Sequence, residues 1–159
     1  LSQLTALTKG EITNIGQACG NGWRKVFNVY AKLLYALDKQ YFSFSSFAST
    51  WQQYRDQYLL QVKSETALIF SPPDFSLLSN GAEVKTLHII CGRTYAKQLV
   101  NNGLDVQLTW LDEEFAIDIA KAVIVCPYFD YRQLSNHKIK RLSVMLTGVL
   151  MGKIQDING

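Results

Sequence analysis

The sequence is poor in the residues that mark several classes of protein. It holds 3 cysteines and 3 prolines among 159 residues, and 18% of its residues are charged. Cys19, Cys91 and Cys126 form no CxxC pair and are odd in number, which argues against both a disulfide framework and a metal site. No apolar run approaches the roughly 18 residues that a membrane-spanning helix needs. We therefore expect reduced thiols, no bound metal and no membrane partner.

Signals for export and for nucleotide binding are also missing. The N-terminus has no basic segment followed by an apolar one, so we expect a cytoplasmic protein. Neither GxGxxG nor GxxxxGK followed by Ser or Thr occurs, and we expect no cofactor. The chain begins at Leu1 rather than at methionine, which leaves room for a first strand upstream of it.

The chain does contain enough apolar material for one core. Its hydrophobic fraction is 48%, and a domain of this length buries about two-thirds of the surface that its unfolded chain exposes. We therefore expect a single domain over residues 1–159. The formal net charge of +3 is too small to establish an anionic partner and does not oppose one.

Apolar periodicity predicts a helical N-terminal third. Apolar residues recur every three to four positions from Gly22 to Asp38 and from Ser46 to Val62, as in amphipathic helices, and more weakly from Glu11 to Cys19. Ser45 or Ser46 is the expected cap of the second helix. The aromatic residues between Tyr41 and Tyr58 could stack on bases, but their helical spacing favours a role in the core.

After Lys63, short apolar runs bounded by turn residues predict strands. Three runs are continuous, as in strands buried on both faces, and a fourth alternates, as in an edge strand: 67–70, 87–91, 122–126 and, at the edge, 106–111. Helices are expected over 93–100 and 135–157. This order predicts an α/β fold, a three-layer sandwich with a mostly parallel open sheet of about four strands flanked by helices.

In such sheets ligands gather where strands end, and one candidate is the turn after the second predicted strand. Gly92 allows the backbone to approach a ligand closely, and the helix that begins at Arg93 presents free amides to an anion. We therefore consider Gly92 and Arg93 as phosphate-binding residues. The alternative is a tight strand-to-helix turn with no ligand.

The loop after the last predicted strand combines more chemistry than packing alone requires. Asp130 can act as a base or orient a water, Arg132 can pair with a phosphate, and Tyr128 can stack on a flat ligand. The alternative is an internal Asp130–Arg132 contact with buried aromatic rings.

The last predicted helix begins with a basic segment. Asn136 and His137 open it, and Lys138, Lys140 and Arg141 follow, so a phosphate can bind Asn136 while His137 supplies an acid or base. The alternative is plain solvated charge. We interpret His88, inside a predicted strand, as structural.

A run of acids follows Trp110, and such runs are usually solvated. It consists of Asp112, Glu113, Glu114 and Asp118.

From Trp23 onward the order of features resembles the uracil-DNA glycosylase superfamily. The similar segments are Gly20-Asn21-Gly22-Trp23-Arg24-Lys25-Val26, the strand and turn from Leu87 to Ala96, and the strand from Val123 to Tyr128. The family's last motif has proline followed by serine, whereas Tyr128 follows Pro127 here. Nothing before Trp23 matches the family's water-activating loop.

This resemblance implies a fold that receives a flipped base at its strand ends. We therefore expect a glycosylase-like domain that binds DNA or a nucleobase-containing ligand, with catalysis undecided. One alternative is a non-enzymatic module that binds a protein partner through the 127–136 loop. A third hypothesis is a small-molecule hydrolase in which Asp130 and His137 converge in one pocket as an acid/base pair.

Overall fold

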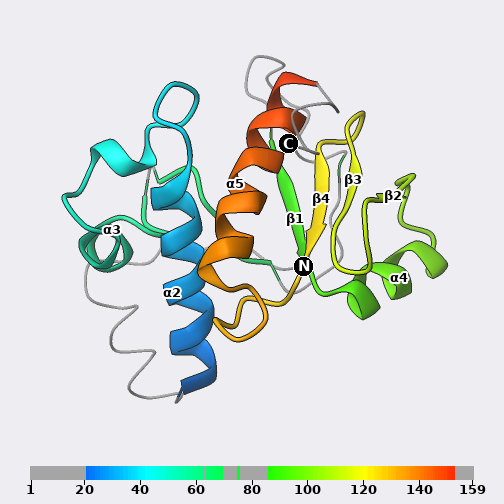
Figure 1. The fold of residues 1–159 in the computed structure, drawn as a ribbon, viewed down its shortest axis with the longest axis horizontal. Coiled ribbons are helices and arrows are strands. Elements are labelled where there is room, and N and C mark those ends of the chain that lie inside the picture. The colour runs from blue at the N-terminus through cyan, green and yellow to red at the C-terminus, as the bar shows by residue number, and fades with distance from the viewer. Residues whose placement is uncertain (1–20, 63, 70–74, 76–85, 153–159) are drawn as a thin grey trace. The chain divides into compact units, whose positions relative to one another are not determined.

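A computed structural model describes residues 21–62, 64–69, 75 and 86–152 as a mixed α/β chain (Figure 1). The chain divides into two compact units, one of Leu1–Ile69 with Phe129–Ser143 and one of Phe70–Tyr128 with Val144–Gly159. The helix predicted over 11–19 lies outside the described residues. The single domain predicted for the whole chain stays a prediction.

The first unit is built around α2 (Asn21–Ala36), which confirms the helix predicted from Gly22. Its apolar side chains recur with the period of the helix, so they form one buried stripe. They are Val26, Phe27, Val29, Leu33 and Leu34. On its opposite face α2 carries polar and basic side chains.

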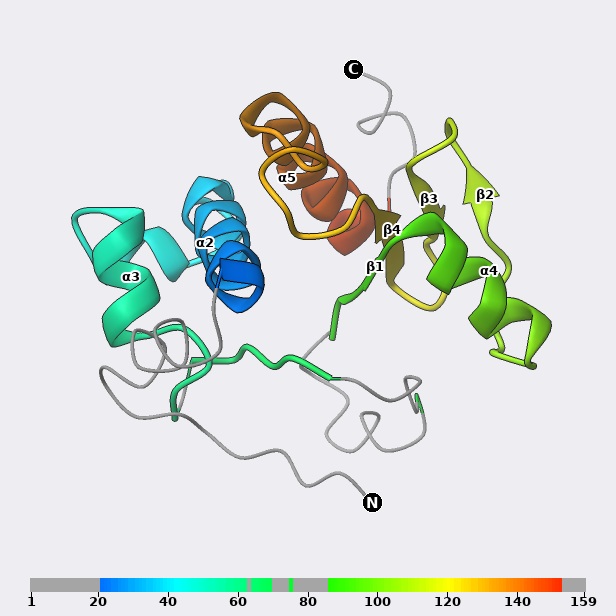
Figure 2. The ribbon, with the colours of Figure 1, turned by 90° about the horizontal axis from the view of Figure 1, so that it is seen from below.

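Beside α2 lie the short helix η1 (Phe44–Ser46) and α3 (Trp51–Gln57), as Figure 2 shows. The helix predicted over 46–62 is therefore shorter than expected. Thr50 has extended dihedrals and accepts a hydrogen bond from the Gln53 amide at 3.1 Å, so Thr50 caps α3 instead of Ser45 or Ser46. The chain leaves the helix at Tyr58, with φ −131°.

The predicted role of the aromatic residues between Tyr41 and Tyr58 is confirmed for some of them. Tyr54 is 1% exposed and packs between Phe44, 6.2 Å away edge-on, and Tyr58, 6.1 Å away in a stacked arrangement. Phe47, by contrast, is 51% exposed although its ring stacks on Tyr58. The core of this unit therefore uses part of the stripe.

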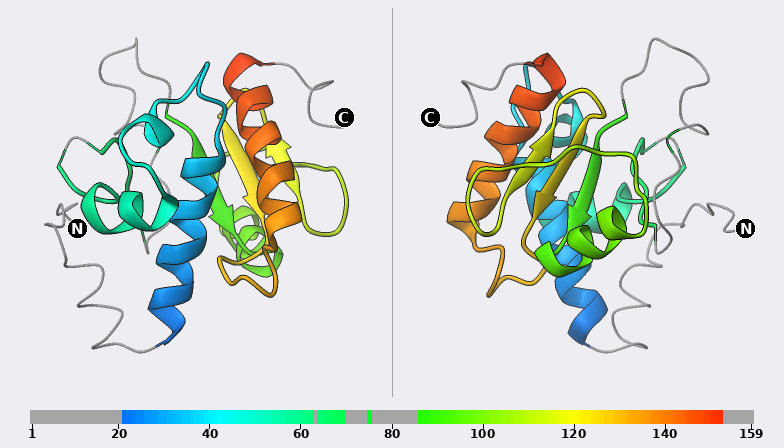
Figure 3. Two further views of the ribbon diagram at one scale, coloured as in Figure 1. Left: turned by 60° about the vertical axis from the view of Figure 1, so that its left-hand side comes forward. Right: turned by 90° about the vertical axis from the view of Figure 1, so that its right-hand side faces the viewer.

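The second unit contains an open four-stranded sheet in the order β1-β4-β3-β2 (Figure 3). Its strands are β1 (His88–Cys91), β2 (Thr109–Trp110), β3 (Ala116–Asp118) and β4 (Val123–Cys126). Only β1 and β4 are parallel, and the other two pairs are antiparallel. The predicted mostly parallel sheet is thus a mixed sheet, because the connections between β2, β3 and β4 are too short for crossovers.

Two strand assignments differ from the prediction. Residues 67–69 form no strand, and Ala67 instead accepts a hydrogen bond from the Tyr30 hydroxyl at 3.0 Å. The strand β3 was not expected, since it is short, lies just after Glu114 and itself includes Asp118 of the acidic run. The edge strand predicted over 106–111 is confirmed, although only Thr109 and Trp110 join the ladder.

The acids after Trp110 are not simply a solvated face. Asp112 closes the turn before β3 by accepting hydrogen bonds from the Glu114 and Phe115 amides, both at 2.8 Å. Asp118 is buried, and its two carboxylate oxygens accept from the Gln107 amide at 2.8 Å and the Lys121 amide at 3.1 Å. For Asp118 the expectation was wrong, because β3 carries it into the core.

The sheet packs one face against α4 (Arg93–Asn101), which confirms the helix predicted after Gly92. The core on this face gathers Ile90, Ala96, Leu99, Ala116, Val123 and Val125.

The last helix, α5 (Asn136–Met151), confirms the helix predicted from Ser135, and residues 153–157 of that prediction lie outside the described residues. The second helical layer of the predicted sandwich stays a prediction. No helix in the described part of the chain has the length and apolar character needed to cross a membrane.

Candidate anion-binding site

The loop before α5 is organised around the carboxylate of Asp130. Its Oδ1 accepts hydrogen bonds from the Arg132 amide at 3.0 Å and from Arg132 Nε at 3.3 Å, and its Oδ2 accepts from Arg132 Nη2 at 3.0 Å. The Asp130 carbonyl also accepts from the Gln133 and Leu134 amides, each at 2.8 Å. The structure thus brings Asp130 and Arg132 together in one tight turn, which we call the Asp130 turn (residues 130–134).

This arrangement fixes the charge state of Asp130. The hydrogen bonds from Arg132 stabilise the ionised form and lower the pKa of Asp130 to about 2, from an ordinary value of 3.8. A carboxylate with so low a pKa is a weak base and is not protonated near neutral pH. Asp130 is therefore suited to holding Arg132 in place and poorly suited to the acid or base role considered from the sequence.

The Asp130 turn contacts α2 of the same unit through Lys25. Lys25 Nζ lies 3.9 Å from Asp130 Oδ2, and it also lies 5.6 Å from the centre of the Tyr131 ring. Phe129 anchors the start of the loop, because its ring packs edge-on against Tyr30 at 5.6 Å. Residues far apart in the sequence, on α2 and on the Asp130 turn, are thereby placed side by side.

A hollow of about 210 Å³ lies where these two segments meet. We call it the α2 pocket, and it is lined by Arg24, Lys25, Asn28, Val29, Lys32 and Tyr131. Arg24, Asn28 and Lys32 follow one another at intervals of four residues, so they share one face of α2. Three of the six lining side chains are cations and none is an acid.

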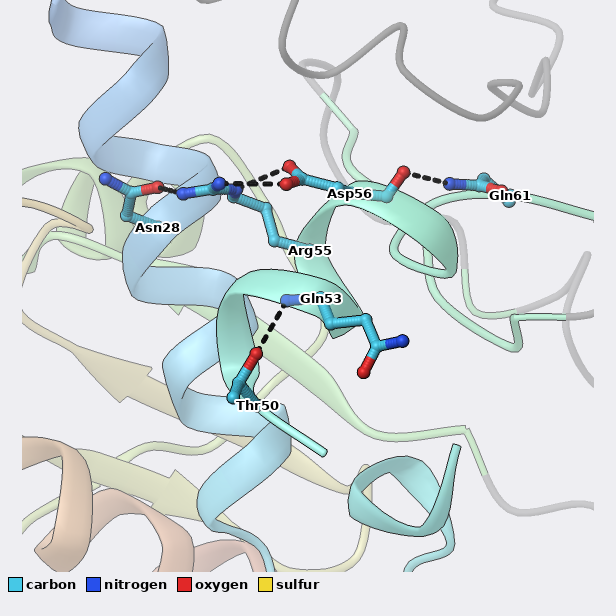
Figure 4. Close-up of polar contacts among 6 residues, drawn as sticks. All are labelled: Asn28, Thr50, Gln53, Arg55, Asp56 and Gln61. Atoms are coloured by element: carbon cyan, nitrogen blue, oxygen red, sulfur yellow. Dashed lines mark hydrogen bonds and ion pairs between the residues drawn. The ribbon is translucent and has the colours of Figure 1, made fainter. Parts of the chain in front are cut away.

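Asn28 is held in a defined orientation by α3 (Figure 4). Arg55 Nη1 donates to Asn28 Oδ1 at 2.7 Å, while Arg55 Nε and Nη2 donate to the Asp56 carboxylate at 2.8 and 3.1 Å. Because Oδ1 is occupied as an acceptor, the Asn28 Nδ2 group, which points away from Arg55 in Figure 4, is left as a donor. Asn28 therefore adds hydrogen-bond donors to the pocket.

Trp51 lies beside the far end of the same face of α2. Lys32 Nζ is 5.0 Å and Arg55 Cζ 5.4 Å from the centre of a Trp51 ring, both within the range of cation–π attraction. Trp51 thus holds Lys32 and Arg55 near each other despite their like charge. Lys32 and Arg55 thus make cation–π contacts with Trp51, as Lys25 does with Tyr131.

The chemistry of the α2 pocket follows from this lining. Arg24, Lys25 and Lys32 offer positive charge, and Asn28 offers a neutral amide donor, so the polar groups are almost all donors. A ligand group that fits them is an acceptor with negative charge on several oxygens, such as phosphate or sulfate. No group of three or more His, Cys, Asp or Glu side chains in the described ranges is placed to hold a metal ion.

The candidate residues at the strand ends fall into both units. Gly92, Arg93 and Tyr128 belong to the second unit, where Gly92 joins β1 to α4 with a φ of 106°. That backbone conformation favours glycine, and the Gly92 amide donates to the Cys126 carbonyl at 2.8 Å, so it is not free for an anion. Both interpretations of this turn are compatible with that geometry, so phosphate binding by Gly92 and Arg93 stays a prediction. Arg93 is exposed, and Tyr128 is 49% exposed.

Asn136 and His137 belong to the first unit and lie exposed at the start of α5. Among the described residues, no hydrogen bond or ion pair joins His137 to Asp130. Their pairing as acid and base stays a prediction. His88 in β1 packs edge-on against Phe75 at 5.0 Å, and burial lowers its pKa. In the described part of the chain neither ring nitrogen of His88 has a hydrogen-bond partner, so the hydrogen-bonded structural role expected for it stays a prediction.

The residues of the α2 pocket were not recognised in the sequence, although one signal was present. The segment from Asn21 to Ala36 contains three lysines or arginines on its polar face and no acid. A solvated helix face usually mixes the two signs in pairs three or four residues apart. Positive charge on one helix face without acids three or four residues away was therefore the sequence signal for this group of side chains.

These observations define a mixed α/β protein with a cation-lined pocket on a helical unit. The chain belongs to a family of unknown function, DUF6942, whose model matches residues 1–147. No curated protein and no solved structure matches the chain.

Proposed function

We propose that this protein binds nucleic acid through its first unit, with a backbone phosphate held in the α2 pocket. The observation that carries the proposal is the lining of that pocket, in which Arg24, Lys25 and Lys32 accompany a donor of Asn28 and no acid is among the lining residues. The Asp130 carboxylate lies 3.9 Å from Lys25 and offsets part of this charge, which leaves Arg24 and Lys32 as the main cations for a ligand. Phosphate oxygens accept hydrogen bonds and carry charge, so they complement each of these groups.

Aromatic rings beside the cations favour nucleic acid over a simple anion. Tyr131 lines the pocket and is 58% exposed, and a ring so placed offers a surface on which a base can stack. The glycosylase-like role expected from the sequence agrees with this ligand class.

Catalysis is not part of the proposal. The carboxylate that the sequence offered as an acid or base, Asp130, is held by Arg132 and kept ionised. Removal of a base needs a group that activates water, and within the described residues Asp130 has a positioning role instead. Binding alone is therefore the function that the geometry supports best.

The test is the affinity of a fluorescent oligonucleotide, measured by anisotropy over a range of salt concentrations. Arg24→Gln removes one pocket cation, and we expect weaker binding with a salt slope smaller by about 0.7 to 0.9, the value for one lost phosphate contact. Lys39→Gln is the matched control, because Lys39 is exposed in the same unit and does not line the pocket. Equal losses in both variants would show that net charge, and not the pocket, attracts the ligand.

A second function, binding of a protein partner through the 127–136 loop, is favoured by one observation. Tyr128 and Tyr131 are 49% and 58% exposed, and tyrosine is common among the residues that anchor interfaces. Tyr128→Ala discriminates the two functions, since it lies outside the α2 pocket. It should leave oligonucleotide affinity unchanged and weaken only a protein complex.

A further inference from the structure

The ligand class can be narrowed from the size of the α2 pocket and from what lies at its rim. We infer that the ligand is a single-stranded nucleic acid whose bases stack on Tyr131 while a phosphate occupies the pocket. This inference rests on the proposed function and adds to it the strandedness of the ligand and the residue that contacts its bases.

The pocket is too small for a whole ligand. Its volume of about 210 Å³ is below the roughly 300 Å³ at which pockets for small molecules begin. It therefore holds one charged group, and the remainder of the ligand lies outside, over the rim. Tyr131 is the aromatic residue of that rim.

Tyr131 is presented by a rigid support. The residues on either side of it, Asp130 and Arg132, are joined by two side-chain hydrogen bonds and one to the Arg132 amide. Its ring has Lys25 Nζ at 5.6 Å and Arg132 Cζ at 5.9 Å from its centre, yet it is 58% exposed. A base can thus stack on Tyr131 while its phosphate meets Lys25.

A second aromatic ring lies beside a cation farther along α2, at Lys32. Trp51 has Lys32 and Arg55 next to its ring. From Arg24 to Lys32 the pocket cations advance along α2 by about 12 Å, at 1.5 Å per residue. Two sites of ring and cation along one helix face suit a polymer with repeated bases and phosphates better than a single nucleotide.

The preference for a single strand follows from the need of Tyr131 to reach the face of a base. In a duplex, the faces of the bases are stacked on one another and cannot reach a side chain such as Tyr131. In a single strand the base faces are free, and stacking of each base on an aromatic side chain adds to the phosphate contacts. A surface that pairs the exposed ring of Tyr131 with cations is therefore better matched to a single strand.

The experiment compares three probes on the whole chain. They are a labelled oligo-dT of about ten nucleotides, the same strand annealed to its complement, and inorganic tripolyphosphate as a competitor. The length of the oligonucleotide lies within the span of about 4 to 16 nucleotides that one single-strand-binding domain covers. We expect the single strand to bind at least about tenfold more tightly than the duplex, and tripolyphosphate to displace it.

Variants of Tyr131 separate stacking from charge. Tyr131→Ala should weaken single-strand binding by about 5- to 150-fold, whereas Tyr131→Phe, which keeps the ring, should stay within about twofold of the wild type. Tyr41→Ala is the matched control, since Tyr41 is exposed in the same unit and does not line the pocket. Loss of binding in Tyr131→Ala but not in the other two variants supports the inference.

Different results would contradict the single-strand inference and the proposed nucleic-acid binding. If the duplex binds as tightly as the single strand and Tyr131→Ala has no effect, while Arg24→Gln still weakens binding, the inference is overturned and the proposed function stands. If no probe binds, or if binding is insensitive to Arg24→Gln, the proposed function fails and the inference fails with it.

Discussion

The amide of Asn28 gives the sharpest test of the α2 pocket, because Asn28→Asp replaces a single heavy atom, Nδ2, by an oxygen and so turns a neutral donor into a charged acceptor. Arg55 donates to Asn28 Oδ1 at 2.7 Å, and a carboxylate would accept that hydrogen bond at least as well. The contact between α2 and α3 should therefore persist. The donor left to the pocket by Nδ2 is replaced by an acceptor with negative charge.

The expected loss of affinity can be worked from Coulomb's law. A carboxylate about 5 Å from a bound phosphate costs about 1 to 3 kcal/mol when the effective dielectric constant lies between about 80 and about 20. This cost corresponds to a dissociation constant about 5- to 150-fold higher. The loss should shrink at high salt, since the pocket is open to solvent.

The assay is anisotropy with the labelled single strand, accompanied by a thermal unfolding curve for each variant. Gln52→Glu serves as the control, because Gln52 is exposed on α3 and its substitution adds the same charge outside the pocket. If Asn28→Asp unfolds at the wild-type temperature and binds with unchanged affinity, Asn28 does not contribute a donor to the ligand. If Gln52→Glu weakens binding as much, the effect is one of net charge.

Further expectations concern stability and reactivity. Asp118→Ala should lower the free energy of unfolding by about 1 to 3 kcal/mol, because it leaves two backbone amides unpaired, whereas Glu113→Ala, at an exposed position, should be nearly neutral in urea unfolding. Thr50→Ala should cost about 1 kcal/mol through loss of the α3 cap, measured in the same way. The pKa of Asp130 is held below its ordinary 3.8, so its contacts stabilise the fold above that pH, and the difference in urea midpoint between wild type and Asp130→Asn should vanish as the pH falls from 3.8 towards 2. Burial raises the pKa of the Cys126 thiol, so Cys126 should resist alkylation in the folded chain and react once it is unfolded, as read by mass spectrometry; labelling of the native protein would contradict its burial.

The elements that the sequence predicted well are those whose apolar pattern is local. The apolar stripe of α2 and the continuous apolar runs of β1 and β4 can be recognised from the local sequence, without knowledge of the elements that pack against them. The strand β3 has only three residues beside a run of acids, and it exists because β2 and β4 pair with it. Its recognition requires tertiary contacts that no short window of sequence contains.

The candidate site was harder to predict for a similar reason. The Asp130–Arg132 contact lies within one turn, and the sequence offered it as one of two alternatives. The α2 pocket is lined also by Tyr131, which lies far from α2 in the sequence, and its Asn28 is oriented by Arg55 of α3. Sequence spacing alone does not reveal which cations such a contact will bring together.

The topology of the sheet also has a consequence for how the chain folds as it is made. Within the described residues β1 pairs only with β4, and the ribosome completes β1 and α4 long before it reaches Val123. The antiparallel strands β2, β3 and β4 follow one another at short intervals and can pair as soon as they emerge, since short loops close at low entropic cost. Until β4 is made, the edge of β1 that pairs with it lacks this partner, and an unpaired strand edge is a template for aggregation of the nascent chain.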